Sequence, residues 1–525
     1  MLPPALRRQT LADLLRRTAA RHPHKPGILC GDTAWTWAQF ADVVERLAAG
    51  LHGQGVAHGD RVAVLARNSH GFAALRYALA RLGAVLVPVN FMLNADEAAY
   101  ILRHSGARLL AVDSGLAALG RDAAARDTAI ARLLWIPGED ASPCPADCLD
   151  FHALADTDAA AHPAPEMAFD RDHLLQIVYT SGTESLPKGA MLTHGAVIDQ
   201  YLSCIVDGEM AAGDVVLHAL PLYHCAQLDV FLGPSVYLGS TSFITSKPTP
   251  DNLLTLIARH RITQFFAPPT VWIGMLRHPL FDEVDLGSLR KGYYGASIMP
   301  VAVIEELIRR VPQMRLWNFY GQTEIAPLAT VLTPEDQLRK PGSAGRAALN
   351  VETRVVDDDM NDVPPGTVGE IVHRSPQLLL GYFNDPERSA AAFAGGWFHS
   401  GDLGVLDADG YLSVVDRKKD MIKTGGENVA SREVEEALYR HEAISEVAVV
   451  GLPHPRWIEA VTAVVVRKAG KGLSEAEVLA HAAQHLAPFK CPKAVLFVDA
   501  LPKNPSGKLL KRELRVKFEG HFGKA

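Results

Sequence analysis

One stretch of small and polar residues decides how this chain is interpreted: Tyr179-Thr180-Ser181-Gly182-Thr183-Glu184-Ser185-Leu186-Pro187-Lys188-Gly189. It follows an apolar run, Leu174 to Val178, that is typical of a buried strand. Its hydroxyls, backbone N–H groups and single ammonium suit an anionic ligand such as a polyphosphate. It is not a P-loop, because Gly rather than Ser or Thr follows Lys188. Taken alone, such a stretch is more often an ordinary surface turn, so other features of the sequence have to decide.

Length and composition limit the class of protein. At 525 residues the chain exceeds the usual size of one hydrophobic core, so two or more domains are expected. Hydrophobic residues make up 48% and charged residues 21%, which is a globular balance. The net charge of −7 does not favour a nucleic-acid partner. Six scattered cysteines without zinc spacing indicate reduced thiols, and we expect a cytoplasmic protein.

The N-terminal 22 residues carry five arginines on an amphipathic pattern. A first helix with a solvated basic face is the favoured interpretation, and a transit helix or a helix on a membrane surface is the alternative. No apolar run approaches the ~18–20 residues of a membrane span, so no transmembrane segment is expected. Peripheral membrane contact and a homodimer stay open.

Strand-like and helix-like stretches alternate over the first 170 residues, which predicts parallel β-α-β units. The clearest predicted strands are 61–65, 84–89 and 109–112, and the clearest predicted helices are 70–82 and 95–103. The stretch 139–165 is rich in Ala, Asp and Pro and is expected to be a surface connection.

The pattern changes after about residue 340, where Gly, Asp and Pro become frequent and short strands such as 369–372 predict a small β subdomain. A charged run, 416–420, then precedes a compact α+β pattern, as expected of a hinge between two cores. We therefore predict a large α/β N-terminal domain with parallel-sheet subdomains and a small β subdomain, followed by a small, mobile α+β C-terminal domain. The predicted bounds are 1–416, a hinge at 417–420, and 421–525.

Two further polar loops follow predicted strands. They are Tyr294-Gly295-Ala296-Ser297 and Tyr320-Gly321-Gln322-Thr323-Glu324. Loops at the carboxyl ends of strands are where α/β sheets bind ligands. Together with the opening stretch, they predict a ligand site built from several loops of one large domain.

With these loops placed, the chain resembles the adenylate-forming superfamily of acyl-CoA synthetases, adenylation domains and luciferases, and most of all the bacterial fatty acyl-CoA ligases. The resemblance covers nearly the whole length, and six motifs carry it in the family's order. They are Thr180–Gly189, Gly295–Ser297, Tyr320–Glu324, Gly396-Trp397-Phe398-His399-Ser400-Gly401-Asp402, Asp416–Asp420 with Gly425-Gly426-Glu427-Asn428, and Leu501-Pro502-Lys503-Asn504-Pro505-Ser506-Gly507-Lys508. The resemblance implies an enzyme that uses ATP, Mg²⁺ and coenzyme A: a carboxylate attacks the α-phosphate, and a thiol then displaces AMP.

The resemblance also implies a role for each matching residue. The β- and γ-phosphates would be held by Thr180, Ser181, Gly182, Thr183 and Lys188. The adenine would lie against Gly295, Ala296, Ser297, Tyr320 and Gly321. Asp402 and Arg417 would bind the ribose. Thr323 would contact the α-phosphate, and Glu324, with Thr183, would hold Mg²⁺. Lys508 would bridge the carboxylate and the α-phosphate, and His224 would gate the acid pocket.

The C-terminal domain of the resembled family rotates between the two half-reactions. Lys419 matches the hinge position, and Gly425 and Gly426 would line the pantetheine tunnel, because glycine lets a backbone approach a narrow chain. Trp457 and the pair Phe489-Lys490 are candidates for contact with the nucleotide of CoA.

The acid pocket is expected among Tyr223, His224, Gln227, Val230, Phe231, Pro268, Trp272, Tyr294 and Ile325-Ala326-Pro327. No basic residue is evidently placed for a second carboxylate, and Asp229 lies off the position that would hold an amino group. A monocarboxylic, largely apolar acid is therefore expected, with medium- to long-chain fatty acids first and aryl or cinnamic acids second. As a lone histidine, His224 would otherwise be a buried core residue.

Other interpretations remain. Glu184-Ser185 replaces the family's usual Thr-Gly and adds negative charge beside the expected triphosphate. This change makes a non-catalytic, nucleotide-binding protein one alternative. Transfer of the adenylate to a carrier protein or an amine is a separate alternative, because the CoA contacts are the part of the sequence that is hardest to interpret. Outside the resemblance, Asp402 would be a turn residue, Glu324 a helix-end charge, 417–419 a solvated face and Lys508 a tail lysine. The joint presence of these residues with Lys188 disfavours those interpretations.

Overall fold

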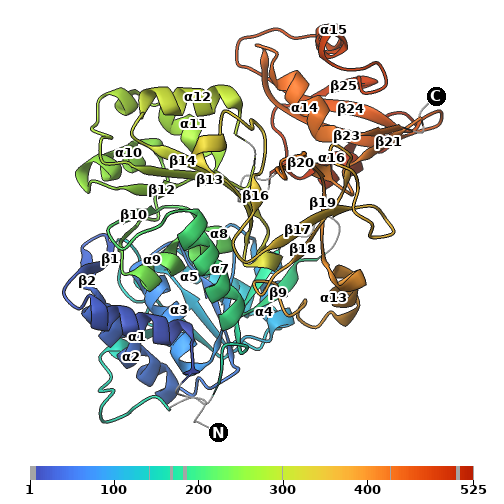
Figure 1. Ribbon diagram of the computed structural model, residues 1–525. Helices are drawn as coiled ribbons and strands as arrows, with labels where there is room; N and C mark the ends of the chain where they lie inside the picture. Colours follow the sequence, from blue (N-terminus) through green and yellow to red (C-terminus); the bar gives the residue numbers. More distant parts are fainter. Residues whose placement is uncertain are drawn as a thin grey trace. The chain divides into compact units, whose positions relative to one another are not determined.

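The computed structural model describes residues 7–140, 142–165, 169–180, 186–297, 299–425, 427–503 and 509–523 (Figure 1). The chain forms two compact units. The first comprises 1–180, 187–353 and 373–398, and the second comprises 181–186, 354–372 and 399–525. Each unit is therefore built from segments that are discontinuous in sequence.

A seven-stranded sheet of the first unit has the strand order β7-β6-β5-β3-β4-β8-β9. Its strands are β3 (Arg61–Leu65), β4 (Val85–Pro88), β5 (Leu109–Val112), β6 (Arg132–Trp135), β7 (Cys148–Asp150), β8 (Leu174–Thr180) and β9 (Lys188–Thr193). Neighbours pair in parallel except for β8 with β9. The expected parallel β-α-β units are thus confirmed.

Helix α3 (His70–Leu82) has the bounds that the sequence predicts. The Ser69 hydroxyl caps it by accepting a hydrogen bond from Phe72 N at 3.0 Å, and Gly83 ends it with a φ of 68° that favours glycine. Nearly every residue of α3 is buried, as expected for a helix covered on several sides. Its neighbours include α1 (Leu11–Arg21) and α2 (Trp37–Gly53).

A nine-stranded sheet of the same unit has the order β16-β15-β14-β13-β12-β10-β11-β1-β2. Its strands are β1 (Pro26–Cys30), β2 (Thr33–Thr36), β10 (Val215–His218), β11 (Thr241–Ile244), β12 (Gln264–Phe266), β13 (Lys291–Gly295), β14 (Arg315–Gly321), β15 (Leu328–Leu332) and β16 (Arg346–Ala347). The helices α10 (Pro250–Arg259), α11 (Pro269–Arg277) and α12 (Val301–Arg310) lie together beside β12–β14 (Figure 1). Their apolar residues form one core cluster with the sheet.

The helices between the two sheets and around them complete the unit. They are α4 (Ala95–Ser105), α5 (Ala117–Ala124), α6 (Phe151–Ala155), α7 (His194–Asp207), α8 (Cys225–Gln227), α9 (Gly233–Leu238) and α13 (Pro386–Ala392), with the π-helical turn η3 (Leu228–Leu232) between α8 and α9.

The expectation that 139–165 is a surface connection is wrong for its middle part, 148–155, which forms β7 and α6. Phe151 and Leu154 are buried in the core, and α6 packs against α2. The close approach depends on Gly50, because a Cβ there would lie 2.5 Å from Leu154 O. Two apolar side chains thus anchor a run whose composition is typical of a loop.

The first helix is part of the core. Leu11, Leu14 and Leu15 of α1 are buried, whereas the Arg16 side chain is 70% exposed, so the favoured interpretation of a helix with a solvated basic face is confirmed. The helices in the described part of the chain are all too short or too polar to cross a lipid bilayer.

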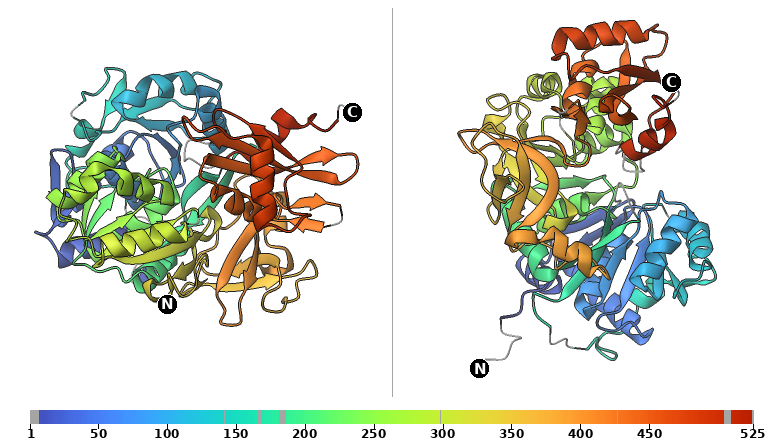
Figure 2. Two further views of the ribbon diagram at one scale, coloured as in Figure 1. Left: turned by 90° about the horizontal axis from the view of Figure 1, so that it is seen from above. Right: turned by 90° about the vertical axis from the view of Figure 1, so that its right-hand side faces the viewer.

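The second unit contains most of a four-stranded sheet of order β17-β18-β19-β20 and a five-stranded sheet of order β22-β21-β24-β23, in which β25 pairs with β24. The strands are β17 (Glu352–Val356), β18 (Gly369–Arg374), β19 (Phe398–Leu406), β20 (Leu412–Arg417), β21 (Ile422–Thr424), β22 (Glu427–Val429), β23 (Ile444–His454), β24 (Ile458–Arg467) and β25 (Ala494–Phe497). The helices are α14 (Ser431–Tyr439), α15 (Glu475–His485) and α16 (Lys511–Phe518) (Figure 2).

Both faces of β23 are covered, because its side chains alternate between two clusters. Val447 and Val449 pack with Leu438 of α14. Ala448 and Val450 pack with Leu514 of α16. The predicted fold class, a large α/β domain followed by a small α+β domain, is therefore confirmed.

Leu438→Ala tests the smaller core. Leu438 is fully buried, so its truncation should lower the unfolding free energy of this unit by about 2–5 kcal/mol. Val516→Ala is the matched control, because that side chain is 67% exposed and should change stability by less than ~0.5 kcal/mol. Chemical denaturation of the full chain measures both, and equal effects would contradict the packing described for α14.

Candidate functional site

The predicted phosphate loop connects two strands that run in opposite directions. Thr180, the last residue of β8, is paired with Lys188, the first residue of β9. The base of the loop is therefore closed by an antiparallel ladder. The predicted residues Ser181, Gly182 and Thr183, together with Glu184-Ser185, lie outside the described residues.

A tyrosine links two of the predicted site residues. The Lys188 ammonium lies 5.0 Å from the centre of the Tyr382 ring, a cation–π distance. The Tyr382 hydroxyl donates a hydrogen bond to Glu324 Oε1 at 3.0 Å. Burial and the adjacent Glu324 carboxylate raise the pKa of Tyr382, so the hydroxyl stays a donor. Lys188 and Glu324 are 136 positions apart by their residue numbers, and both contact the side chain of Tyr382.

Thr323 and His224 belong to the same neighbourhood. The Thr323 hydroxyl lies 3.3 Å from Cys225 Sγ, and Cys225 is the residue after His224. Burial raises the pKa of the Cys225 thiol to about 12, so it is not a thiolate nucleophile at neutral pH. His224 is exposed, and its Nδ1 accepts a hydrogen bond from Ala226 N at 3.2 Å. The alternative of a buried core histidine is therefore wrong.

The two remaining loops leave neighbouring parallel strands. Gly295, the last residue of β13, is paired with Phe319 of β14, so Ala296-Ser297 lies at the same end of the sheet as Tyr320 and Gly321, the last two residues of β14. Ala296 has a φ of 64°, and Ala296 and Ser297 are exposed.

Two glycines of these loops are required by neighbouring backbone. A Cβ on Gly295 would lie 2.4 Å from Phe319 O, and a Cβ on Gly321 would lie 1.8 Å from Pro327 O. The contacts that exclude a side chain here are internal to the protein, so the smallness of these residues does not by itself indicate an adenine.

Asp402 and Arg417 meet on the four-stranded sheet of the second unit. They are paired across β19 and β20, and Arg417 Nε lies 3.0 Å from Asp402 Oδ1. Asp402 is buried, and its backbone N–H donates to Ser400 Oγ at 3.0 Å. The interpretation of Asp402 as a turn residue is wrong, because it lies within β19. Lys419 lies in the turn that follows β20 and is partly buried.

Gly425 follows β21 and has a φ of 59°. Its N–H donates to Trp457 O at 2.9 Å, which places the predicted pantetheine residue beside a predicted CoA contact. Gly426 and Lys508 lie outside the described residues. The described residues on either side of 504–508 are Lys503 and Leu509, and these two form an antiparallel bridge.

The predicted acid-pocket residues belong to separate side-chain clusters of the first unit. Trp272 and Tyr294 share the cluster under α10–α12, where Trp272 Nε1 donates to Tyr293 O at 3.0 Å. Val230 and Phe231 lie in an aromatic cluster, and Ala326 lies in the core beside α3. Pro268 is the N-terminal cap of α11.

Tyr223 and Gln227 differ in how their polar groups are satisfied. The Tyr223 hydroxyl is buried without a hydrogen-bond partner among the described residues, and burial raises its pKa to about 12. Both polar atoms of the Gln227 amide have partners within the protein, because Nε2 lies 2.8 Å from His218 Nδ1 and Oε1 accepts from Leu220 N at 3.3 Å. Tyr223 therefore has polar capacity left for a ligand, whereas Gln227 supports the loop.

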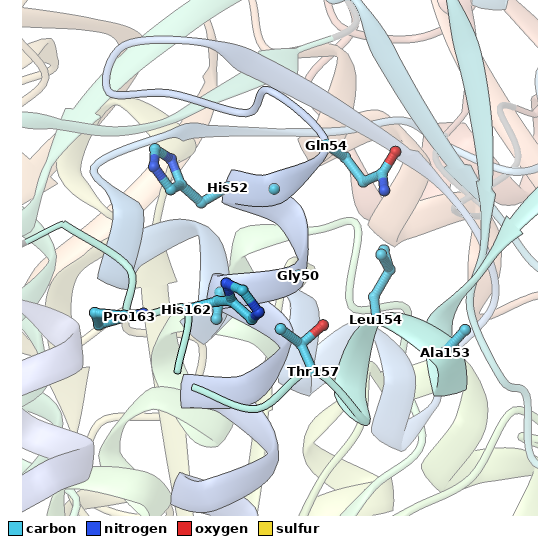
Figure 3. Close-up of a pocket in the computed structure, with 10 residues that line it drawn as sticks. Gly50, His52, Gln54, Ala153, Leu154, Thr157, His162 and Pro163 are labelled. Atoms are coloured by element: carbon cyan, nitrogen blue, oxygen red, sulfur yellow. The ribbon is translucent and has the colours of Figure 1, made fainter. Parts of the chain in front are cut away.

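A cavity of about 550 Å³ lies elsewhere, at the end of α2 beside α6 (Figure 3). Gly50, Leu154 and Thr157 are among the residues that line it, and none of the predicted site residues does.

Sequence reasoning missed Tyr382 and Cys225. Tyr382 lies in a short loop after β18, and its contact with Glu324 depends on tertiary pairing, so no spacing in the sequence indicates it. Cys225 follows the predicted gate residue directly, and that proximity was the available signal.

Comparison with known proteins gives the family. The model of AMP-binding enzymes matches residues 15–383, and that of the AMP-binding enzyme C-terminal domain matches 433–508. A feruloyl-CoA synthase of Amycolatopsis sp. is 36% identical over 98% of this chain and 100% of its own. A long-chain-fatty-acid–CoA ligase of Mycobacterium tuberculosis is 37% identical over 93% of this chain and 94% of its own. The solved fatty acyl CoA synthetase of that organism superposes with a TM-score of 0.77 at 33% identity, covering 98% of this chain and 99% of that one. The chain therefore belongs to the family of AMP-binding enzymes, among its acyl-CoA ligases.

Proposed function

We propose that this acyl-CoA ligase activates a monocarboxylic acid with a largely apolar acyl group, a medium- or long-chain fatty acid first. The observation that carries the proposal is the convergence of Lys188, Tyr382 and Glu324 at the base of the 181–187 loop. A cation and a carboxylate held at one tyrosine side chain suit Mg-ATP better than a neutral ligand, and the hydroxyls that the sequence carries at 180–185 are proposed to complete the site.

In the first half-reaction an oxygen of the acid forms a bond to the α-phosphorus, and the bond from that phosphorus to the bridging oxygen of pyrophosphate breaks. Negative charge grows on the leaving pyrophosphate, so the Lys188 ammonium stabilises the transition state. Thr323 is proposed to orient the α-phosphate. In the second half-reaction the CoA thiol gives up its proton to solvent and its sulfur bonds to the acyl carbon, and AMP leaves with the electron pair of the acyl–oxygen bond.

Glu324 fits the role of a Mg²⁺ ligand. It is buried, and the Tyr382 hydrogen bond occupies only part of the acceptor capacity of its carboxylate. Mg²⁺ is commonly bound through one or two carboxylates and the phosphates of the substrate, and when bound it would neutralise phosphate charge. The contribution of the protein is to hold Glu324 in one orientation before ATP arrives.

Asp402 is proposed to accept hydrogen bonds from the ribose hydroxyls. The Arg417 guanidinium at 3.0 Å offsets the cost of burying this carboxylate, and a carboxylate accepts several hydrogen bonds at once. Lys508 is proposed to bridge the acid and the α-phosphate, and Lys419, Gly425 and Gly426 are proposed to act in domain rotation and CoA binding.

The acid is proposed from the residues that the sequence predicts for the acid pocket. Val230, Trp272 and Ala326 are buried and apolar, which suits an uncharged acyl group. An aryl or cinnamic acid is the second candidate, because the similar Amycolatopsis protein is a feruloyl-CoA synthase. Transfer of the adenylate to a carrier protein or an amine is the third.

Release of AMP and pyrophosphate with a panel of carboxylic acids, with and without CoA, tests the proposal. CoA-dependent AMP release with octanoate through palmitate is the expected result. Ferulate or benzoate as the best substrate would instead support an aryl acid, and adenylate accumulating regardless of CoA would support a carrier or amine acceptor. The absence of AMP and pyrophosphate release with every acid would contradict the proposed activity.

Lys508→Ala separates the half-reactions. We expect adenylate formation to fall by at least about a hundredfold, because the cation between two anionic reactants is lost, while thioester formation from synthetic acyl-AMP persists. Lys503→Ala is the control, since Lys503 is paired with Glu446 at 2.7 Å. Equal loss of both half-reactions in Lys508→Ala would contradict the assignment.

Tyr382→Phe tests the orientation of Glu324. The variant keeps the ring under Lys188 but removes a hydrogen bond to a carboxylate, so kcat/KM for ATP should fall about ten- to a hundredfold. Tyr293→Phe is the matched control, because it removes a buried hydroxyl that donates to Gly208 O at 2.6 Å. An unchanged kcat/KM in Tyr382→Phe would show that Glu324 needs no such support.

A further inference from the structure

The segment 220–229 connects β10 to the turn η3 and carries Tyr223 and His224. It has only a three-residue helix of its own, so its shape depends on groups outside it. Two such groups come from one short stretch of the chain: Asn68, two residues before α3, and Arg76, in the middle of α3.

Asn68 holds the beginning of the segment. Its Oδ1 accepts a hydrogen bond from Leu222 N at 2.7 Å, and its Nδ2 donates to Leu220 O at 2.7 Å. Nδ2 also donates to Thr245 O at 3.1 Å, after β11. The side chain is buried, so these bonds have no competition from water. One amide thus determines the course of the backbone that leads into Tyr223 and His224.

Arg76 holds the end of the segment. Its Nη2 lies 2.5 Å from Asp229 Oδ1, and both side chains are almost completely buried. Asp229 Oδ2 also accepts from Gln176 Nε2 at 2.7 Å, on the strand β8 that leads to the phosphate loop. Burial raises the pKa of Asp229, and the Arg76 guanidinium opposes that rise. The π-helical turn that starts at Leu228 is therefore fixed to α3 and to β8.

Asp229 is also connected to the loop of Glu324. In the orientation that satisfies its neighbours, the Gln200 amide donates to Asp229 O at 3.1 Å and to Ala326 O at 3.2 Å. The segment, the strand β8 and the turn at Ala326 are consequently joined by buried hydrogen bonds rather than by apolar packing alone. Buried ionic groups add little to the free energy of unfolding compared with apolar residues, but they fix the orientation of the segments that they join.

We propose that Asn68 and the Arg76–Asp229 ion pair are positioning groups that set the acid selectivity of the enzyme by fixing segment 220–229. The inference rests on the proposed acyl-CoA ligase function and on the prediction from the sequence that Tyr223 and His224 line the acid pocket. Asn68 and Arg76 themselves do not touch the acid. Without them the backbone that carries Tyr223 and His224 shifts, so the discrimination between acids changes while the contacts to ATP remain.

Asn68→Ala is the first test. For the two best acids of the wild-type panel, the ratio of their kcat/KM values is measured, because this ratio does not depend on the fraction of folded enzyme. We expect the ratio to change by about tenfold or more and KM for ATP to stay within about twofold. Asn350→Ala is the matched control: Asn350 Nδ2 donates to Asp199 O at 2.9 Å, away from the segment, and its loss should leave the ratio unchanged.

The double variant Arg76→Met with Asp229→Leu is the second test, since removing both charges avoids an unpaired buried charge. A shifted ratio with a Tm near that of the wild type supports the inference. An unchanged ratio in both the Asn68 and the double variant overturns it while the proposed ligase activity stands. A wild type without any acid-dependent AMP release would overturn the proposed function, and the inference with it.

Discussion

The antiparallel pairing of β8 with β9 is the constraint on which the site depends. Because β9 runs back along β8, Lys188 returns to the level of Thr180 at the edge of the sheet. The edge is then extended, since Phe383 N donates to Gly189 O at 2.8 Å and Met191 N donates to Gly381 O at 3.1 Å. These backbone bonds bring Tyr382 next to Lys188. A reversal of one strand thus assembles a cation, an aromatic ring and a carboxylate.

Charged side chains also connect the structural elements around residues 416–420. Arg417 and Lys418 bind carboxylates of the four-stranded sheet, Asp402 and Glu370 respectively. Asp416 and Asp420 bind the C-terminal helices instead, because Asp416 Oδ2 accepts from Ser431 N at 2.7 Å and Asp420 Oδ1 lies 2.6 Å from Arg515 Nη2. The alternative of a solvated charged face is therefore wrong for Arg417, which is half-buried in its ion pair, whereas Lys418 is exposed as that alternative expects. Arg417 and Lys418 thus contact the four-stranded sheet, whereas Asp416 and Asp420 contact α14 and α16.

The parts that were predicted from sequence are those whose signals are local. The bounds of β3 and α3 follow from an apolar run, a serine cap and a terminal glycine, all within 61–83. The burial of Phe151 and Leu154 is not predicted, because the two residues lie in a stretch whose composition is otherwise typical of a loop. Asp402 and Arg417 were recognised by motif, and their pairing follows from a short antiparallel connection. Tyr382, Asn68 and Asp229 could not be recognised, because their partners are set by tertiary contacts over 58, 154 and 153 residues.

The division of the chain also limits how this protein can be shortened. Strand β18 lies in sequence before the last segment of the first unit, but its sheet neighbour β19 lies after it. A fragment that ends near residue 398 would retain β17 and β18 with an uncovered edge, and such edges pair with other chains and aggregate. Fragments cut at a single peptide bond are thus poor starting points for crystallisation or domain exchange, and exchange partners need to carry 354–372 together with the C-terminal part.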